Sequence, residues 1–154
     1  TEMGVTEPEA TFSACFGAAF MMWHPNKYAE LLADKIKTHK AKAWLVNTGW
    51  TGGAHGVGSR IKLKYTRAII DAIQNGDFDN MDMVQDAEFG FQIPVSCPGV
   101  PAEILVPKNT WEDKEGYEQT KGKLIGLFQG NFKSFESEVV DKIVAAGPKT
   151  KLSV

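Results

Sequence analysis

The sequence predicts a mixed α/β fold, and three patterns support this prediction. Residues 25–37 repeat apolar side chains at helical spacing, residues 43–46 form a short apolar run, and residues 89–95 alternate between apolar and other residues. The first pattern is typical of an amphipathic helix, and the other two are typical of strands. Helical and extended segments are therefore expected to follow one another along the 154 residues.

Composition places the chain among ordinary folded domains, with 43% hydrophobic and 23% charged residues. A formal net charge of −2 excludes a protein that coats nucleic acid, because no basic excess is available to neutralise phosphates. No segment approaches the roughly 20 apolar residues that cross a bilayer. We therefore expect a soluble, cytoplasmic protein without a membrane or nucleic-acid partner, in which Cys15 and Cys97 are free thiols.

The first quarter of the chain is expected to be a loop followed by a helix. Residues 1–12 show no sustained period, and residues 12–23 mix small and aromatic side chains that fit either core packing or a position under a ligand. Pro25 is well placed as the first residue of the amphipathic helix. Because residues 43–46 are apolar and bounded by turn residues, they are interpreted as a buried strand.

Later segments continue the alternation of extended and helical patterns. After an extended segment at residues 60–65, Thr66 is expected to cap a helix that ends at Gly76, with Tyr65 and Ile70 forming a hydrophobic staple. Residues 89–95 predict a half-buried strand, and a proline-rich connection follows it. Two more helices are expected, one over residues 113–132 and a short one that Ser137 caps and Gly147-Pro148 stops.

Five glycines lie in the loop at residues 47–60, which is the strongest candidate for an anion site. The spacing from Gly53 to Gly58 matches half of a Walker A loop, but Ser59 stands in place of the lysine and Arg60 in place of the hydroxyl residue. The dinucleotide-binding fingerprint is absent, which disfavours a Rossmann-type oxidoreductase. Spacing alone leaves open whether the segment is a ligand-binding loop or a flexible connection.

Other candidate residues surround this loop. Arg60 and Arg67 carry guanidinium groups that suit phosphate oxygens or a planar base, although either could be an ordinary surface residue. Thr66 fits a helix cap as well as a ligand contact. The three histidines have no metal-ligand spacing, and no nucleophile motif is present, so we assign neither a metal site nor a catalytic residue.

Several long segments resemble the ATP-dependent phosphoenolpyruvate carboxykinases. They read G-V-T-E-P-E-A-T-F-S-A-C-F-G-A-A-F at 4–20, H-P-N-K-Y-A-E-L-L at 24–32, L-V-N-T-G-W-T-G-G at 45–53 and G-S-R-I-K-L-K-Y-T-R-A-I-I-D-A-I at 58–73. The resemblance continues through 88–94 and 103–111. Members of this family are several hundred residues long, so the resemblance implies that residues 1–154 are the C-terminal fragment of a P-loop-type nucleotide-binding domain, with a mixed sheet flanked by helices.

The resemblance also implies a site. Arg60 and Ile61 would contact the nucleotide, with Arg60 near the base; Thr66 would also reach it, and Phe20 would flank the adenine. Residues 1–11 would belong to a mobile loop on the lid side, and residues 47–60 would form the nucleotide loop. Ser59 departs from the family, because many relatives have lysine there, which leaves one positive charge fewer near the ligand.

The implied reaction converts oxaloacetate and ATP to phosphoenolpyruvate, carbon dioxide and ADP in gluconeogenesis. The P-loop and the ligands for Mg²⁺ or Mn²⁺ would lie in the N-terminal remainder of the same polypeptide, which would be the partner of this chain. The fragment alone is then expected to be inactive. The alternative is an inactive fragment or truncated paralogue that binds a nucleotide or a protein.

Overall fold

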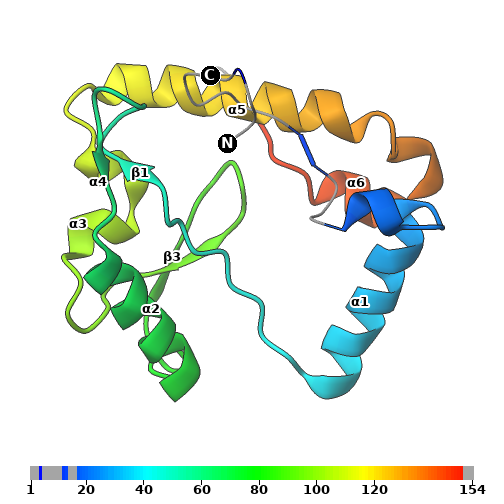
Figure 1. Ribbon diagram of the computed structural model, residues 1–154, viewed down its shortest axis with the longest axis horizontal. Coiled ribbons are helices and arrows are strands. Elements are labelled where there is room, and N and C mark those ends of the chain that lie inside the picture. Colours follow the sequence, from blue (N-terminus) through cyan, green and yellow to red (C-terminus); the bar gives the residue numbers. More distant parts are fainter. Residues whose placement is uncertain (1–3, 5–11, 14–16, 151–154) are drawn as a thin grey trace. The chain divides into compact units, whose positions relative to one another are not determined.

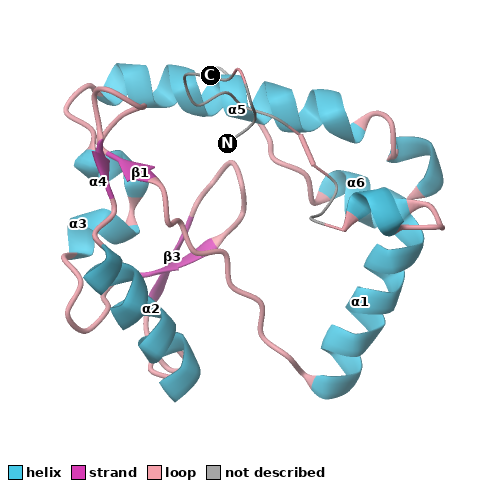
Figure 2. Ribbon diagram, viewed as in Figure 1, coloured by secondary structure: helices cyan, strands magenta, loops and turns pink. Residues whose placement is uncertain are grey.

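A computed structural model describes residues 4, 12–13 and 17–150, and it combines helices with two small antiparallel sheets (Figures 1 and 2). The mixed α/β class is therefore confirmed. The chain forms two compact units: unit 1 comprises Thr1–Trp44 and Asn131–Ala145, and unit 2 comprises Leu45–Gly130 and Ala146–Val154. Apart from Gly4, the loop expected at residues 1–11 lies outside the described residues.

Unit 1 contains η1 (Ala18–Phe20), α1 (Pro25–His39), η2 (Glu136–Glu138) and α6 (Asp141–Ala145). Helix α1 begins at Pro25 as predicted, and His24 caps it because its Nδ1 accepts the backbone N–H of Asn26 at 3.3 Å. The helix ends where Lys40 adopts a left-handed conformation. Its apolar face remains uncovered within the unit, since Leu32 is 61% exposed.

The C-terminal part of unit 1 differs from the prediction in one respect. Ser137 does not cap the last helix but lies inside η2, and the helix begins only at Asp141. The reason is that Val139 is extended and separates the two elements. The expected end is confirmed, because α6 stops at Ala145, ahead of Gly147 and Pro148.

Unit 2 holds the remaining elements, except that the last two residues of α5 fall in unit 1. They are β1 (Trp50–Thr51), β2 (Ser59–Arg60), α2 (Leu63–Asn75), β3 (Met83–Gln85), β4 (Gln92–Pro94), α3 (Ala102–Leu105), α4 (Pro107–Thr110) and α5 (Lys114–Phe132). Strand β1 pairs antiparallel with β2, and β3 pairs antiparallel with β4. The strand predicted at residues 89–95 is thus shorter than expected, while the helix over residues 113–132 is confirmed as α5.

Residues 43–46 form no strand in the described part of the chain, so this prediction is wrong. A strand exists only beside a neighbour that completes its hydrogen bonds, and both two-stranded sheets form without these residues. The expected burial is wrong as well, because Leu45 is 82% exposed.

Helix α2 starts earlier than predicted. It begins at Leu63 with Lys62 as the N-cap, so Thr66 lies within the helix, and the predicted cap and staple are wrong. The extended segment ends early because the hairpin of β1 and β2 closes at Arg60 and the chain turns directly into the helix. The predicted end is confirmed: Gly76 has a φ of 77° and donates its N–H to the carbonyls of Ala72 and Ile73.

The buried apolar residues of the described chain all lie in unit 2, and they are Ala72, Phe78, Cys97 and Ile125. Cys97 is a free thiol as expected, while Cys15 lies outside the described residues. Burial, followed by the nearby carboxylate of Asp77, raises the pKa of the Cys97 thiol. Among the helices of the described residues, none combines the length and apolar character needed to cross a bilayer.

Candidate functional site

The glycine-rich loop is a hairpin in which Trp50 pairs with Arg60 and Thr51 pairs with Ser59. A Cβ atom added to Gly58 would lie 2.5 Å from the carbonyl oxygen of Gly53 and 2.6 Å from that of Thr51. Only glycine fits such a close approach of backbone to backbone. The spacing of Gly53 and Gly58 is therefore explained by closure of the hairpin, which differs from a loop that wraps a phosphate.

Hydrogen bonds hold the base of this hairpin. The side-chain oxygen of Asn47 accepts the N–H of Gly49 at 2.9 Å, and its amide nitrogen donates to the carbonyl of Trp50 at 3.1 Å. The N–H of Ile61 also donates to the carbonyl of Gly49 at 2.9 Å. These contacts fix the direction in which the chain leaves the hairpin.

A second contact ties the hairpin to α4, which lies beside β1 in Figure 1. The hydroxyls of Thr51 and Thr110 are 2.7 Å apart, and Thr110 Oγ1 also donates to the carbonyl of Pro107 at 2.8 Å. Gly52 has a φ of 78°, and a Cβ atom there would lie 3.0 Å from the carbonyl oxygen of Thr110. The hairpin is consequently a supported element of unit 2, and it can present a side chain in a defined position.

Arg60 is the charged residue that the hairpin presents. Its side chain is exposed, and no carboxylate among the described residues forms an ion pair with Arg60 or with Arg67. Ile61 follows directly and is half-buried. A guanidinium that no protein carboxylate neutralises is suited to an anionic or planar ligand.

Thr66 lies one turn into α2 and is half-buried. Because Lys62 occupies the N-cap position, the hydroxyl of Thr66 does not serve as a helix cap. The helix-capping role expected for Thr66 is therefore excluded, and the ligand contact stays a prediction. Arg60, Ile61 and Thr66 lie within seven residues, so the turn from hairpin to helix brings them into one short segment of unit 2.

Phe20 belongs to unit 1, where it ends η1 and is 88% exposed. The interpretation of this ring as a core residue is therefore wrong. The same holds for Trp23, which is 61% exposed. Trp23 does lie beside Tyr28, with ring centroids 6.2 Å apart. An aromatic ring as exposed as Phe20 is free to face a ligand or another polypeptide.

His55, at the tip of the hairpin, contacts Trp50 edge to face, with centroids 5.2 Å apart. This contact gives the histidine a packing role inside the loop. Among the described residues, no group of three His, Cys, Asp or Glu side chains is arranged to hold a metal ion.

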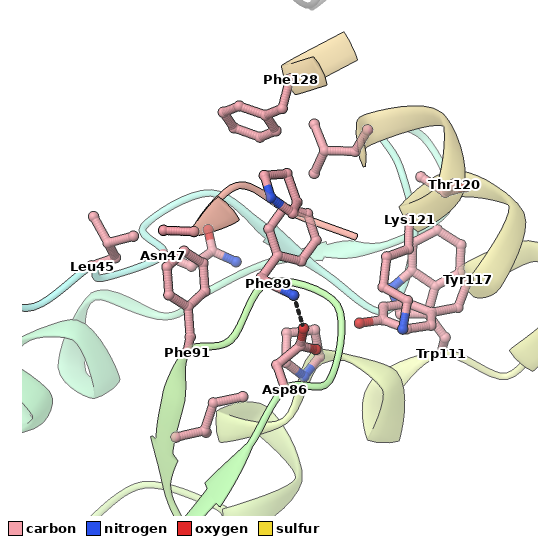
Figure 3. Close-up of a pocket in the computed structure, with 15 residues that line it drawn as sticks. Leu45, Asn47, Asp86, Phe89, Phe91, Trp111, Tyr117, Thr120, Lys121 and Phe128 are labelled. Atoms are coloured by element: carbon pink, nitrogen blue, oxygen red, sulfur yellow. Dashed lines mark hydrogen bonds between the residues drawn. The ribbon is translucent and has the colours of Figure 1, made fainter. Parts of the chain in front are cut away.

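A second candidate site is an apolar cavity of about 560 Å³ in unit 2, which no local pattern in the sequence indicates. Figure 3 shows Phe89 at its centre, between Phe91 and Phe128. The ring of Phe89 stacks on Phe91 with centroids 5.8 Å apart and meets Phe128 edge to face at 6.1 Å. Leu45, Asn47, Asp86, Phe89, Phe91, Ile93, Pro107, Trp111, Tyr117, Thr120, Lys121, Leu124, Phe128, Ala146 and Pro148 line the cavity.

The polar groups of the cavity wall bind one another. Lys121 Nζ lies 3.0 Å from Glu88 Oε2 and 3.3 Å from Glu118 Oε2, and the Lys121 and Glu88 side chains are only 10% and 7% exposed. Burial by itself lowers the pKa of Lys121, but the hydrogen bonds to the two carboxylates outweigh it and the pKa is raised. A hydrogen bond from Lys108 lowers the pKa of Glu118 to about 2.

Comparison with known proteins gives a consistent result. A protein-family model described as phosphoenolpyruvate carboxykinase matches residues 1–103. The chain is 60% identical over 148 residues to "phosphoenolpyruvate carboxykinase (ATP)" of Dictyostelium discoideum, which covers 96% of this chain and 26% of the relative. Proteins of the same name from Flavobacterium johnsoniae and Thermus thermophilus are 55% and 51% identical, and the match covers 98% of this chain and 28% of each. The chain thus spans about a quarter of the length of these relatives.

Proposed function

This chain belongs to the phosphoenolpyruvate carboxykinase family, and from that premise we propose that it forms the adenosine side of the ATP site in an ATP-dependent carboxykinase. The observation that carries the proposal is Arg60, an exposed guanidinium that a supported hairpin presents and that no carboxylate among the described residues neutralises. The guanidinium would lie near the base, with Ile61 and the Thr66 hydroxyl as further nucleotide contacts. Phe20 would flank the adenine.

The reaction we propose for the complete enzyme uses oxaloacetate and ATP and yields phosphoenolpyruvate, carbon dioxide and ADP. Decarboxylation leaves an enolate, and its oxygen attacks the γ-phosphoryl group. In this chemistry the chain positions the nucleoside, and the phosphate-binding loop lies in sequence that the chain does not contain. This is a lyase reaction of cytoplasmic gluconeogenesis.

A divalent cation, Mg²⁺ or Mn²⁺, supplies charge neutralisation at transferring phosphates in such enzymes. The described residues offer no cluster that fits this ion. As the resemblance implies, its ligands would lie in the N-terminal remainder of the polypeptide, and we assign it no step through this chain. The second candidate is a non-catalytic module that binds adenine nucleotide or protein.

The test uses a complete carboxykinase in which this chain replaces the matching quarter of the Dictyostelium discoideum relative. Arg60→Ala should raise the Kd for ATP about tenfold or more, because a hydrogen bond to a charged group contributes roughly 1.5–3 kcal/mol. Lys64→Ala is the matched control, since this cation lies two residues before Thr66 in the first turn of α2, and its ammonium lies over the Tyr65 ring, 5.0 Å from the ring centroid.

Arg60 would not belong to the site if Arg60→Ala left the ATP affinity unchanged. The same conclusion would follow if Lys64→Ala weakened ATP binding equally. Activity separates the two candidate functions. The carboxykinase should turn over oxaloacetate in the complete protein and show no activity in the isolated chain. A complete protein that binds ATP but performs no decarboxylation would favour the module.

A further inference from the structure

The ring of Phe20 has little packing to hold it in place. Phe20 is 88% exposed, and Met22, two residues further on, is 90% exposed. A side chain this exposed takes its direction mainly from the backbone that carries it, because no surrounding surface selects one rotamer. Phe20 ends η1, so the place of its ring depends on how the chain between η1 and α1 is held.

A tyrosine side chain holds the backbone of this connection. The N–H of Phe20 donates to the carbonyl of Gly17 at 2.9 Å, within the turn that forms η1. The N–H groups of Met22 and Trp23, by contrast, donate to the hydroxyl oxygen of Tyr28 at 3.1 and 3.4 Å. One hydroxyl on α1 therefore binds two successive amides of the chain that runs from η1 into the helix.

The position of Tyr28 on α1 explains this reach. His24 is the N-cap, so Trp23 stands directly before the cap and Tyr28 is the fourth helical residue. Helical side chains tilt towards the N-terminus of their helix, which carries the hydroxyl back over the incoming chain. The rings of Trp23 and Tyr28 also lie with their centroids 6.2 Å apart. Two aromatic residues at these positions form a hydrophobic staple, which fixes the angle at which a chain enters a helix.

We propose that Tyr28 is a positioning residue for the nucleotide, because its hydroxyl fixes the chain that carries Phe20 to the adenine. The proposal rests on the adenine contact of Phe20 in the proposed function. Without the hydroxyl, the amides of Met22 and Trp23 would bind water, which imposes no direction on the chain. Phe20 would then occupy more positions, and ATP would have to order the segment when it binds.

Tyr28→Phe in the complete carboxykinase that carries this chain tests the proposal, because it keeps the staple with Trp23 and removes only the hydroxyl. The Kd for ATP should rise about three- to tenfold. The Kd for inorganic tripolyphosphate, which has no base, should stay unchanged. Lys27→Met is the control: it removes an exposed ion pair with Glu30, 3.6 Å long, from the same turn of α1 and should change neither Kd.

Two results of this experiment would overturn the positioning role. One is an ATP affinity that Tyr28→Phe leaves unchanged. The other is an equal loss of affinity for ATP and for tripolyphosphate, because the hydroxyl would then support the fold as a whole and not the contact with the base.

A double-mutant cycle with Phe20→Leu shows whether Tyr28 acts through Phe20. Phe20→Leu should weaken ATP binding, and adding Tyr28→Phe should then weaken it by less than about twofold more. Fully additive losses would overturn the proposal. An unchanged ATP affinity in Phe20→Leu would overturn it together with the adenine contact of Phe20, while Arg60→Ala reports on the rest of the proposed function separately.

Discussion

The ion pair between Lys121 and Glu88 allows a quantitative prediction about the wall of the cavity. At 3.0 Å and an effective dielectric constant of about 20, the two charges attract by roughly 5 kcal/mol, most of which offsets the cost of burying them. Lys121→Met keeps the apolar part of the lysine side chain but leaves the carboxylate of Glu88 without its cation. The Glu88 side chain is only 7% exposed. We expect α5 to lose about 3–5 kcal/mol of local stability, because a buried charge is left without its cation.

The partner substitution should reverse most of this loss. Glu88→Gln combined with Lys121→Met removes both charges, so the double variant should lie within about 1 kcal/mol of the original protein. Glu118 contributes less to the cycle, because its side chain is 30% exposed and keeps Lys108 Nζ at 2.6 Å. The coupling energy of the double-mutant cycle should therefore fall between about 2 and 4 kcal/mol.

Native-state hydrogen exchange at Ile125 is the assay. This residue is 2% exposed, lies one turn beyond Lys121 on α5, and reports the free energy of local opening. Lys123→Met is the control, since this lysine is exposed on the same helix. A loss below about 1 kcal/mol for Lys121→Met, or a double variant no more stable than the single one, would refute the reasoning.

Three further predictions concern the hairpin, the acid response and the isolated chain. Gly58→Ala should accelerate hydrogen exchange of the Ile61 amide, because the new Cβ would force the hairpin open at a cost of about 1–3 kcal/mol. Gly122→Ala is the control and should not accelerate this exchange, because a Cβ at Gly122 on α5 meets open space. Slow exchange of the Ile61 amide in both variants would contradict the prediction. The pKa of Glu118 falls from 4.5 to about 2 on folding, so its contribution is complete above 4.5 and is lost as the pH falls towards 2. Glu118→Gln should therefore flatten the acid side of the stability profile by about 1 kcal/mol for this partly exposed pair, and an unchanged profile would count against the contact with Lys108. Finally, the isolated chain should melt without a sharp transition, because apolar faces such as the cavity stay uncovered; a cooperative calorimetric peak would overturn that expectation.

The helices were the predictable part of this fold, because their signals are local. Pro25 at the first position and apolar residues at helical spacing sufficed for α1, and the same spacing located α5 despite its glycines. The start of α2 was not predictable in this way. It depends on where the hairpin closes, which the hydrogen bond from Ile61 to Gly49 determines across a loop of eleven residues.

Strands and the cavity were harder because both require partners that are distant in sequence. The run at residues 43–46 has strand composition, yet no local pattern says whether a neighbouring strand is present. The cavity is built from segments near residues 45, 89, 120 and 148, which no local period connects. The nucleotide contacts expected around Arg60 stay a prediction, whereas the reason for Gly53 and Gly58 emerged only from the close approach of their backbones.

Asn47 connects the two candidate sites. Its side chain lines the cavity, and the same side chain holds Gly49 and Trp50 at the base of the hairpin. Trp50 in turn pairs with Arg60, so the position of the guanidinium depends on contacts that begin at the cavity rim.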